Sequence, residues 1–161
     1  MSGPARVAIV MGSSSDRATM DAAVSALREL GVESETRVLS AHRTPDAVRE
    51  WARGLEGRGI QIVIAGAGGA AHLAGPVAAH TTLPVIGVPL AAPNAIAGGL
   101  DALLATVQMP RGVPVATVAV GEAGAANAGI LAAQILALSA PDLAARVKAV
   151  REAMAAKVLG G

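Results

Sequence analysis

The stretch Val7-Ala8-Ile9-Val10-Met11, followed by Gly12-Ser13-Ser14-Ser15-Asp16, decides the fold of this chain. A continuous run of apolar residues is typical of a strand that is buried on both faces of a parallel sheet. Apolar residues then recur at helical spacing over 16–30, and the pattern stops at Gly31, a residue type that commonly ends helices. A buried strand, a short polar turn and an amphipathic helix form the repeating unit of an α/β protein.

The same unit repeats along the rest of the chain. We expect strands over 7–11, 35–39, 61–65, 85–88 and 113–120. The expected helices cover 16–30, 45–55, 71–80, 100–106, 123–138 and, as a last amphipathic helix, about 141–158. Five strands, each followed by a helix, predict a three-layer α/β/α sandwich around a parallel sheet of the flavodoxin or Rossmann type. Because no change of composition divides the chain, we expect residues 1–161 to form one domain.

The composition is unusually apolar and narrows the classes of partner. Hydrophobic residues make up 53% of the chain and charged residues 16%, with no Asp, Glu, Lys or Arg between Arg58 and Asp101. Glycines and prolines break that stretch into pieces too short to span a bilayer, so we expect no membrane segment. The apolar excess instead predicts a homo-oligomer in which neighbouring subunits cover helices, with the helix over about 141–158 packing on those neighbours.

The net charge and the scarcity of aromatic residues and cysteine argue against several kinds of partner and site. A net charge of +1, with Trp51 as the lone member of the Phe, Tyr and Trp group, argues against nucleic acid as a partner. The absence of cysteine excludes a disulfide framework, a thiol nucleophile and a cysteine-based zinc site. Residues 1–6 lack the apolar core of a signal peptide, so we expect the protein to act in the cytoplasm.

The chemically richest turn is Ser40-Ala41-His42-Arg43-Thr44-Pro45, between an expected strand and an expected helix. Thr44 is a good N-cap and Pro45 suits the first helical position, which places the turn at the carboxyl edge of the sheet, where such folds bind ligands. Arg43 can bind a phosphate through two hydrogen bonds, and His42 can exchange protons near neutral pH. Either residue alone is also compatible with an ordinary surface side chain.

Two other turns at the same edge can share that site. The turn over 12–16 offers hydroxyls and amides to anionic oxygens, and Asp16 can accept from sugar hydroxyls, although the same residues suit a plain helix cap. The turn Gly66-Ala67-Gly68-Gly69-Ala70-Ala71-His72 lets a ligand approach the backbone, and His72 either contacts that ligand or packs. It formally matches a dinucleotide-binding pattern, but the acidic residue needed about twenty positions on is missing, which favours a smaller ligand.

Five motifs follow one another in a fixed order. They are Gly12-Ser13 with Ser15-Asp16, the turn 40–45, residues 65–73, Val107-Gln108-Met109-Pro110, and Ala125-Ala126-Asn127-Ala128-Gly129. Together they resemble the class I N5-carboxyaminoimidazole ribonucleotide mutase family, the PurE family of purine biosynthesis, from Arg6 to about Leu138. The resemblance implies that a carboxylate moves from the exocyclic nitrogen to ring carbon 4 of the ribonucleotide, through carbon dioxide held in a closed site. It also implies an octamer and no metal, ATP or organic cofactor.

The resemblance assigns roles within the three turns. His42 matches the catalytic proton shuttle of the family, and Ser13, Asp16 and Arg43 match residues that bind the substrate. The other residues that the resemblance places at the pocket are Ser40, Ala41, Gly68, Gly69, Ala70, Ala71 and His72.

Rival functions remain open. Class II relatives carboxylate aminoimidazole ribonucleotide directly with carbon dioxide, but they tend to carry lysine where this chain has Arg43. A non-catalytic nucleotide-binding oligomer would not require the imidazole of His42. A receiver-type signalling domain has little support, because the first strand ends without an acidic cluster for magnesium. The chain departs from the family pattern at Ala74-Gly75-Pro76 and over 90–100, where it is longer, so we expect loops of different shape there.

Overall fold

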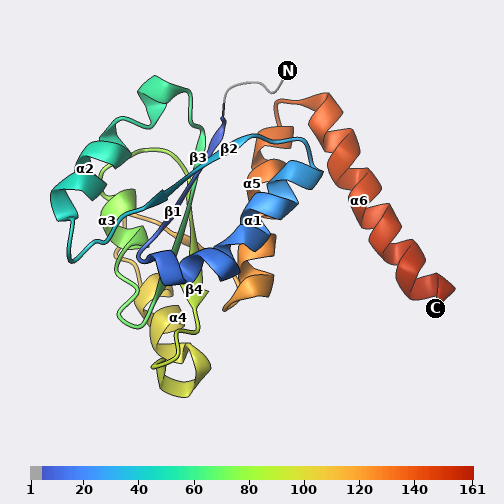
Figure 1. The fold of residues 1–161 in the computed structure, drawn as a ribbon. Coiled ribbons are helices and arrows are strands. Elements are labelled where there is room, and N and C mark those ends of the chain that lie inside the picture. The colour runs from blue at the N-terminus through green and yellow to red at the C-terminus, as the bar shows by residue number, and fades with distance from the viewer. Residues whose placement is uncertain (1–4) are drawn as a thin grey trace.

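The computed structural model describes residues 5–161 and shows a five-stranded sheet between two layers of helices (Figure 1). All the strands are parallel and lie in the order β2-β1-β3-β4-β5. Their bounds are β1 (Val7–Met11), β2 (Ser34–Val38), β3 (Ile62–Gly68), β4 (Val85–Leu90) and β5 (Ala116–Thr117). This strand order is that of flavodoxin-like sheets, so the predicted α/β fold is confirmed. The signal-peptide prediction rests mostly on residues 1–4, which lie outside the described residues.

Helices cover both faces of the sheet. One face carries α1 (Arg17–Glu29) and α5 (Glu122–Ala137), and the other carries α2 (Pro45–Arg53), α3 (Ala74–Ala78) and α4 (Leu100–Val107) (Figure 1). Short 3-10 helices lie in the connections, namely η1 (Ser14–Asp16), η2 (Glu56–Arg58) and η3 (Ile96–Gly98). The last helix, α6 (Pro141–Gly160), packs near its start through Leu143 and then extends away from the body, with 151–160 exposed. No helix in the described part of the chain is long and apolar enough to cross a membrane.

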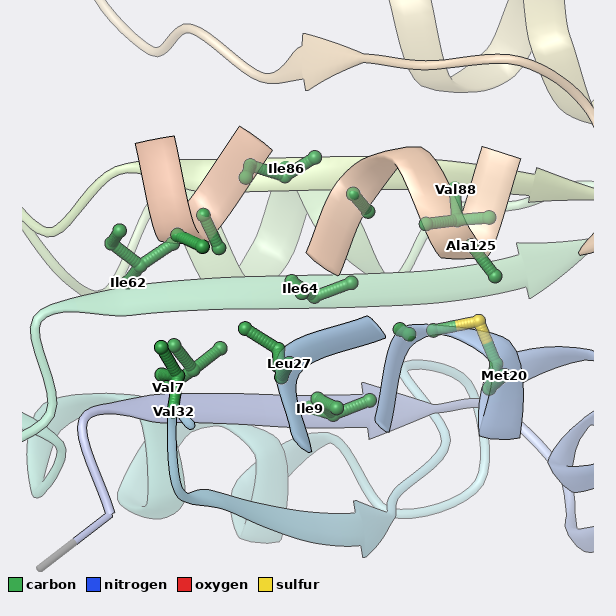
Figure 2. Close-up of a cluster of buried hydrophobic side chains, with 14 of the residues drawn as sticks. Val7, Ile9, Met20, Leu27, Val32, Ile62, Ile64, Ile86, Val88 and Ala125 are labelled. Carbon is green, nitrogen blue, oxygen red and sulfur yellow. The ribbon is translucent and has the colours of Figure 1, made fainter. Parts of the chain in front are cut away.

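The interior strand β1, which lies between β2 and β3, explains why the first apolar run has no alternation. Val7, Ile9 and Met11 pack with α1 and α5, whereas Ala8 and Val10 pack with α2 and α3, and all five residues are fully buried. Figure 2 shows the first of these two clusters, where side chains of three neighbouring strands meet Leu27 of α1 and Ala125 of α5. Both faces of the strand are therefore core, as the continuous hydrophobic pattern predicts.

Helices α1 and α5 approach each other through small residues. A Cβ added at Gly129 of α5 would lie 2.7 Å from the carbonyl oxygen of Ala23 and 3.1 Å from the Cβ of Ala26, both on α1. The side chains of Ala125, Ala128 and Ala132 on α5 are fully buried. The small residues allow α5 to lie directly against the helix that follows the first turn of the predicted site.

We expect Gly129→Ala to lower the free energy of unfolding by about 1–2 kcal/mol. Because the contact is with a backbone oxygen that cannot move aside, overpacking costs about 2–3 kcal/mol, and alanine returns about 1 kcal/mol of helix propensity. Urea denaturation followed by circular dichroism measures the change. Gly57→Ala is a matched control, because nothing lies within 4 Å of a Cβ at that position. A Gly129→Ala protein as stable as the control would contradict the close helix contact.

Three elements differ from their predicted bounds by three residues or more at one end. Strand β3 runs on to Gly68, so residues 66–68 extend the sheet instead of forming a turn. The predicted helix over 71–80 is limited to α3, because Ala71 has a φ of +34°, outside the helical region. The predicted strand over 113–120 pairs with β4 only at Ala116 and Thr117, at the edge of the sheet.

Candidate active site

The connections after β1, β2 and β3 meet at the carboxyl edge of the sheet and line a partly open cavity of about 350 Å³. All the residues predicted for the site line this cavity, namely Ser13, Asp16, Ser40, Ala41, His42, Arg43, Gly68, Gly69, Ala70, Ala71 and His72. Parallel strands end at the same edge, which is why turns far apart in the sequence converge there. The structure brings the predicted residues together, while their individual roles remain predictions.

The turn after β1 is a capping box that also lines the cavity. The hydroxyl of Ser13 accepts from the Ser15 amide at 3.3 Å, and the Asp16 carboxylate accepts from the Ser13 amide at 3.0 Å. Burial raises the pKa of Asp16 above its ordinary value of 3.8, and the hydrogen bond from the Ser13 amide lowers it in part. This turn can therefore cap the helix and bind a ligand at once, because the Asp16 carboxylate can accept hydrogen bonds from the Ser13 amide and from a ligand.

We expect Asp16→Asn to gain stability relative to the wild type as the pH rises from 4 to 7. The pKa of Asp16 is higher in the folded protein than in the unfolded chain, where it is 3.8. The protonated carboxyl therefore stabilises the fold fully below pH 3.8, and this stabilisation is lost as the pH rises through the folded-state pKa. The asparagine amide keeps an oxygen for the Ser13 amide but carries no charge. Urea denaturation of both proteins at each pH checks this, and a difference in unfolding free energy that falls toward pH 7 would contradict it.

The turn after β2 is held by Thr44 in a way that differs from the prediction. Thr44 occupies the N-cap position of α2 and Pro45 is the first residue of the helix, but the Thr44 side chain makes no cap hydrogen bond. Its backbone is not extended there, and its hydroxyl instead accepts from the Ser40 amide at 2.9 Å and donates to the Ser40 carbonyl at 3.1 Å. These bonds close the turn that carries Ala41, His42 and Arg43.

The guanidinium of Arg43 lies across the mouth of the first turn. Its Nη2 is 3.4 Å from the Gly12 carbonyl oxygen, and its Nε is 3.4 Å from the Ser40 hydroxyl. Both contacts are long, and Arg43 makes no salt bridge within residues 5–161. A positive charge with donors to spare on a cavity wall can bind an anionic group, as predicted for a phosphate.

The turn after β3 is strained where it approaches the second turn. Ala71 has a φ of +34°, which costs a residue other than glycine about 1 kcal/mol or more. The turn places Nδ1 of His72 2.8 Å from Nε2 of His42, and the two rings meet edge to face at an interplanar angle of 80°. The cavity thus contains a pair of imidazoles in direct contact.

The glycines of this turn have different surroundings from those expected. A Cβ at Gly66 would overlap the Met20 sulfur in the core, and one at Gly68 would lie 3.1 Å from the Cβ of Ala92. Gly66 therefore gives room to Met20 and does not line the cavity, whereas Gly68 lies against Ala92 and also lines the cavity. Gly69 also lines the cavity and has a φ of +59°, with open space where a Cβ would project.

Sequence reasoning missed the contribution of the connection after β4, which places Ala92 and Asn94 on the cavity wall. The sequence did contain a signal for this contribution, because a parallel strand predicted over 85–88 must end at the same edge of the sheet as the other strands. Asp101 holds this connection by accepting from the amides of Ile96 at 3.0 Å and Ala102 at 2.8 Å. The Ile96 and Ala102 hydrogen bonds lower the pKa of Asp101 below its ordinary value. The longer segment over 90–100 is therefore part of the site.

A family profile described as AIR carboxylase matches residues 6–157, nearly the whole chain. The chain belongs to the AIR carboxylase family. The resemblance inferred from the five motifs is therefore confirmed.

Relatives within the AIR carboxylase family agree in name and fold. The chain is 51% identical over 153 residues to the N5-carboxyaminoimidazole ribonucleotide mutase of Vibrio cholerae, covering 95% of this chain and 94% of that protein. It is 53% identical to the mutase of Escherichia coli K12, covering 97% and 91%, and 54% identical to that of Mycobacterium tuberculosis H37Rv, covering 93% and 84%. The crystal structure of Treponema denticola PurE matches with a TM-score of 0.86 at 31% identity, covering 96% of this chain and 94% of that one.

Within residues 5–161, no group of three or more His, Cys, Asp or Glu side chains could hold a metal ion.

Proposed function

We propose that the protein is an N5-carboxyaminoimidazole ribonucleotide mutase, an isomerase of purine biosynthesis that forms 4-carboxyaminoimidazole ribonucleotide. The observation that carries this proposal is that one cavity contains both the imidazole of His42 and the guanidinium of Arg43. Membership of the AIR carboxylase family and identities above 50% to proteins named as this mutase support it. We also propose that the protein acts in the cytoplasm, where a charged ribonucleotide is retained.

Each group of the cavity has a task in this reaction. Arg43 and the Ser13 turn bind the phosphate, and Asp16 accepts hydrogen bonds from the ribose hydroxyls. When the bond between the exocyclic nitrogen and the carboxylate breaks, its electron pair stays on nitrogen, which takes a proton from His42. Carbon 4 then forms a bond to the released carbon dioxide and returns its proton to His42, so that the proton count balances.

The cavity walls suit a reaction that must retain carbon dioxide. Apolar residues make up part of the cavity lining, namely Ala41, Ala67, Ala70, Ala71, Leu73 and Ala92. Excluding water from such a site limits the loss of a reactive intermediate to solvent. Retention of carbon dioxide distinguishes a mutase from an enzyme that takes it from solution.

The deciding experiment is an assay without ATP and with chelator present, which follows 4-carboxyaminoimidazole ribonucleotide from two alternative substrates. We expect efficient turnover of N5-carboxyaminoimidazole ribonucleotide and little product from aminoimidazole ribonucleotide with bicarbonate. Use of the second substrate alone would assign the protein to the direct carboxylases. Turnover of neither would favour a nucleotide-binding protein that has lost catalysis.

We further propose that the chain assembles into a homo-oligomer, with the octamer implied by the resemblance as the expected form. Exposed apolar side chains continue from the cavity loop along α4, at Ile96, Leu100, Leu104 and Val107, and Met154 and Val158 are exposed on α6. Apolar rows of this kind are typical of surfaces that another subunit covers.

Light scattering after size-exclusion chromatography tests the assembly. We expect a single large species for the wild type and smaller species for Leu104→Glu, because a charge in the row disfavours burial. Glu29→Lys, a charge change on an exposed residue of α1, is the control. A monomeric wild type would contradict the proposal.

A further inference from the structure

The connection between β4 and α4 contributes Ala92 and Asn94 to the cavity lining, and Asn94 is the polar residue of the two. We propose that Asn94 is a specificity-determining residue whose side-chain amide donates to the carboxylate of the bound ribonucleotide. The site then prefers the carboxylated ribonucleotide over the same molecule without its carboxylate. This inference rests on the proposed function, in which the substrate carries that carboxylate.

The strand order places Asn94 at the end of the cavity away from the predicted phosphate site. Strand β3 lies between β1 and β4 in the sheet, and Gly68 at the end of β3 pairs with Leu90 at the end of β4. The residues proposed to bind phosphate and ribose follow β1 and β2, on the other side of β3. A ribonucleotide whose phosphate lies beside Arg43 therefore extends its heterocycle, with the carboxylate on it, toward the connections after β3 and β4.

A closed turn holds Asn94 at this end of the cavity. Pro93 and Asn94 are the central residues of the turn, and both residue types are favoured in turns. The turn is closed by the Ala95 amide, which donates to the Ala92 carbonyl at 2.9 Å. On one side it continues from the pairing of β4 with β3, and on the other it is held by the hydrogen bond from the next amide to the Asp101 carboxylate. The fold therefore sets the position of Asn94 in the free protein.

The side chain of Asn94 has hydrogen-bonding groups to spare. It is exposed, and within residues 5–161 the side-chain hydrogen bonds of this connection are made by Asp101 and not by Asn94. An asparagine amide offers two N–H donors and one acceptor oxygen. Among the described residues that line the cavity, Asn94 has the one side-chain amide, and the connections after β3 and β4 otherwise contribute only His72 as a polar side chain. A carboxylate bound at this end therefore meets an uncharged donor at Asn94.

An uncharged donor suits a carboxylate that must leave as carbon dioxide. The carboxylate loses its negative charge when its bond to nitrogen breaks, so a cation beside it would stabilise the bound substrate more than the transition state and slow the reaction. The guanidinium of Arg43 is directed instead to the Gly12 carbonyl and the Ser40 hydroxyl, in the first two turns. An amide makes a weaker hydrogen bond to a carboxylate than a cation does, and so selects the carboxylated substrate with a smaller effect on its decarboxylation.

Two ligands that differ only in the carboxylate test this inference. Calorimetry gives the affinities of 4-carboxyaminoimidazole ribonucleotide and of aminoimidazole ribonucleotide for the wild type, Asn94→Ala and Asn94→Asp. We expect Asn94→Ala to weaken binding of the carboxylated ligand by about tenfold or more, as is typical when a hydrogen bond to a charged group is lost. Asn94→Asp keeps the shape of the side chain but repels a carboxylate, so we expect a larger loss. The affinity for aminoimidazole ribonucleotide is expected to stay nearly unchanged in Asn94→Ala.

The control is Ala91→Asp, which adds a carboxylate to the same connection at an exposed residue that does not line the cavity. We expect its affinities to stay close to those of the wild type. An unchanged affinity for the carboxylated ligand in Asn94→Ala, or equal losses for the two ligands, would overturn the proposal. Binding is measured separately from turnover, so a wild type that binds both ligands without mutase activity would refute the proposed function alone. An active mutase whose preference for the carboxylated ligand survives in Asn94→Ala would refute this inference alone, and a wild type that binds neither ligand would refute both.

Discussion

Replacing His42 by asparagine is expected to lower kcat by about 10²–10⁴-fold while a substrate analogue still binds, because an amide cannot exchange a proton near neutral pH. The proposed reaction needs a proton at the exocyclic nitrogen and removes one from carbon 4, and His42 lies on the cavity wall where both atoms would be bound. Steady-state kinetics with N5-carboxyaminoimidazole ribonucleotide gives kcat, and calorimetry with a non-reacting analogue gives the affinity.

The matched control is the same replacement at His80, a histidine that does not line this cavity and whose asparagine variant is expected to stay active. Turnover in His42→Asn close to the wild-type rate would show that another group moves the proton. Loss of analogue binding together with turnover would assign His42 a binding role.

Replacing Arg43 by alanine is expected to weaken substrate binding by about 10–100-fold with a smaller effect on kcat. Hydrogen bonds to a charged group contribute about 1.5–3 kcal/mol, and about 1.4 kcal/mol corresponds to a factor of ten in affinity. The guanidinium makes only long contacts to Gly12 and Ser40, so little folding stability is lost with it. Analogue affinity by calorimetry and thermal unfolding of the free protein separate the two effects.

Arg43→Lys is the control that keeps the charge and loses the forked pair of donors. We expect its affinity to lie between those of the wild type and Arg43→Ala, since a lysine binds phosphate as a point charge. An affinity unchanged in Arg43→Ala would remove Arg43 from the phosphate site.

The strands and most helices could be predicted because hydrophobic pattern and local propensity agree there. The apolar run over 7–11 has the predicted bounds, and Pro45 begins α2 as expected. The helix predicted over 71–80 began too early. Alanine has a high helix propensity wherever it stands, whereas the position of Ala71 between β3 and the cavity imposes a left-handed conformation there. The strand predicted over 113–120 is longer than the observed strand, since apolar residues at the edge of a sheet can pack on the core without pairing with the neighbouring strand.

The location of the site could be predicted and its contacts could not. Strands of a parallel sheet share one carboxyl edge, so the turns at His42 and His72 had to be near each other. That the two rings touch depends on the backbone of Ala71, and the presence of Asn94 depends on the path of the segment held by Asp101. These are properties of three-dimensional packing that no local pattern encodes.

The dependence of the cavity on α5 has a consequence for protein synthesis. Every side chain on the cavity wall precedes residue 95, so a ribosome has added all of them before it reaches α5. Yet α5 completes the core beneath β1 and β3 through Ala125, Ala128 and Ala132. Until those alanines emerge, Ile9 and Ile64 lack part of their cover, and the strands that carry the turns are not held in place. The residues of the site are thus among the first to be translated, and the site is among the last parts of the protein to form.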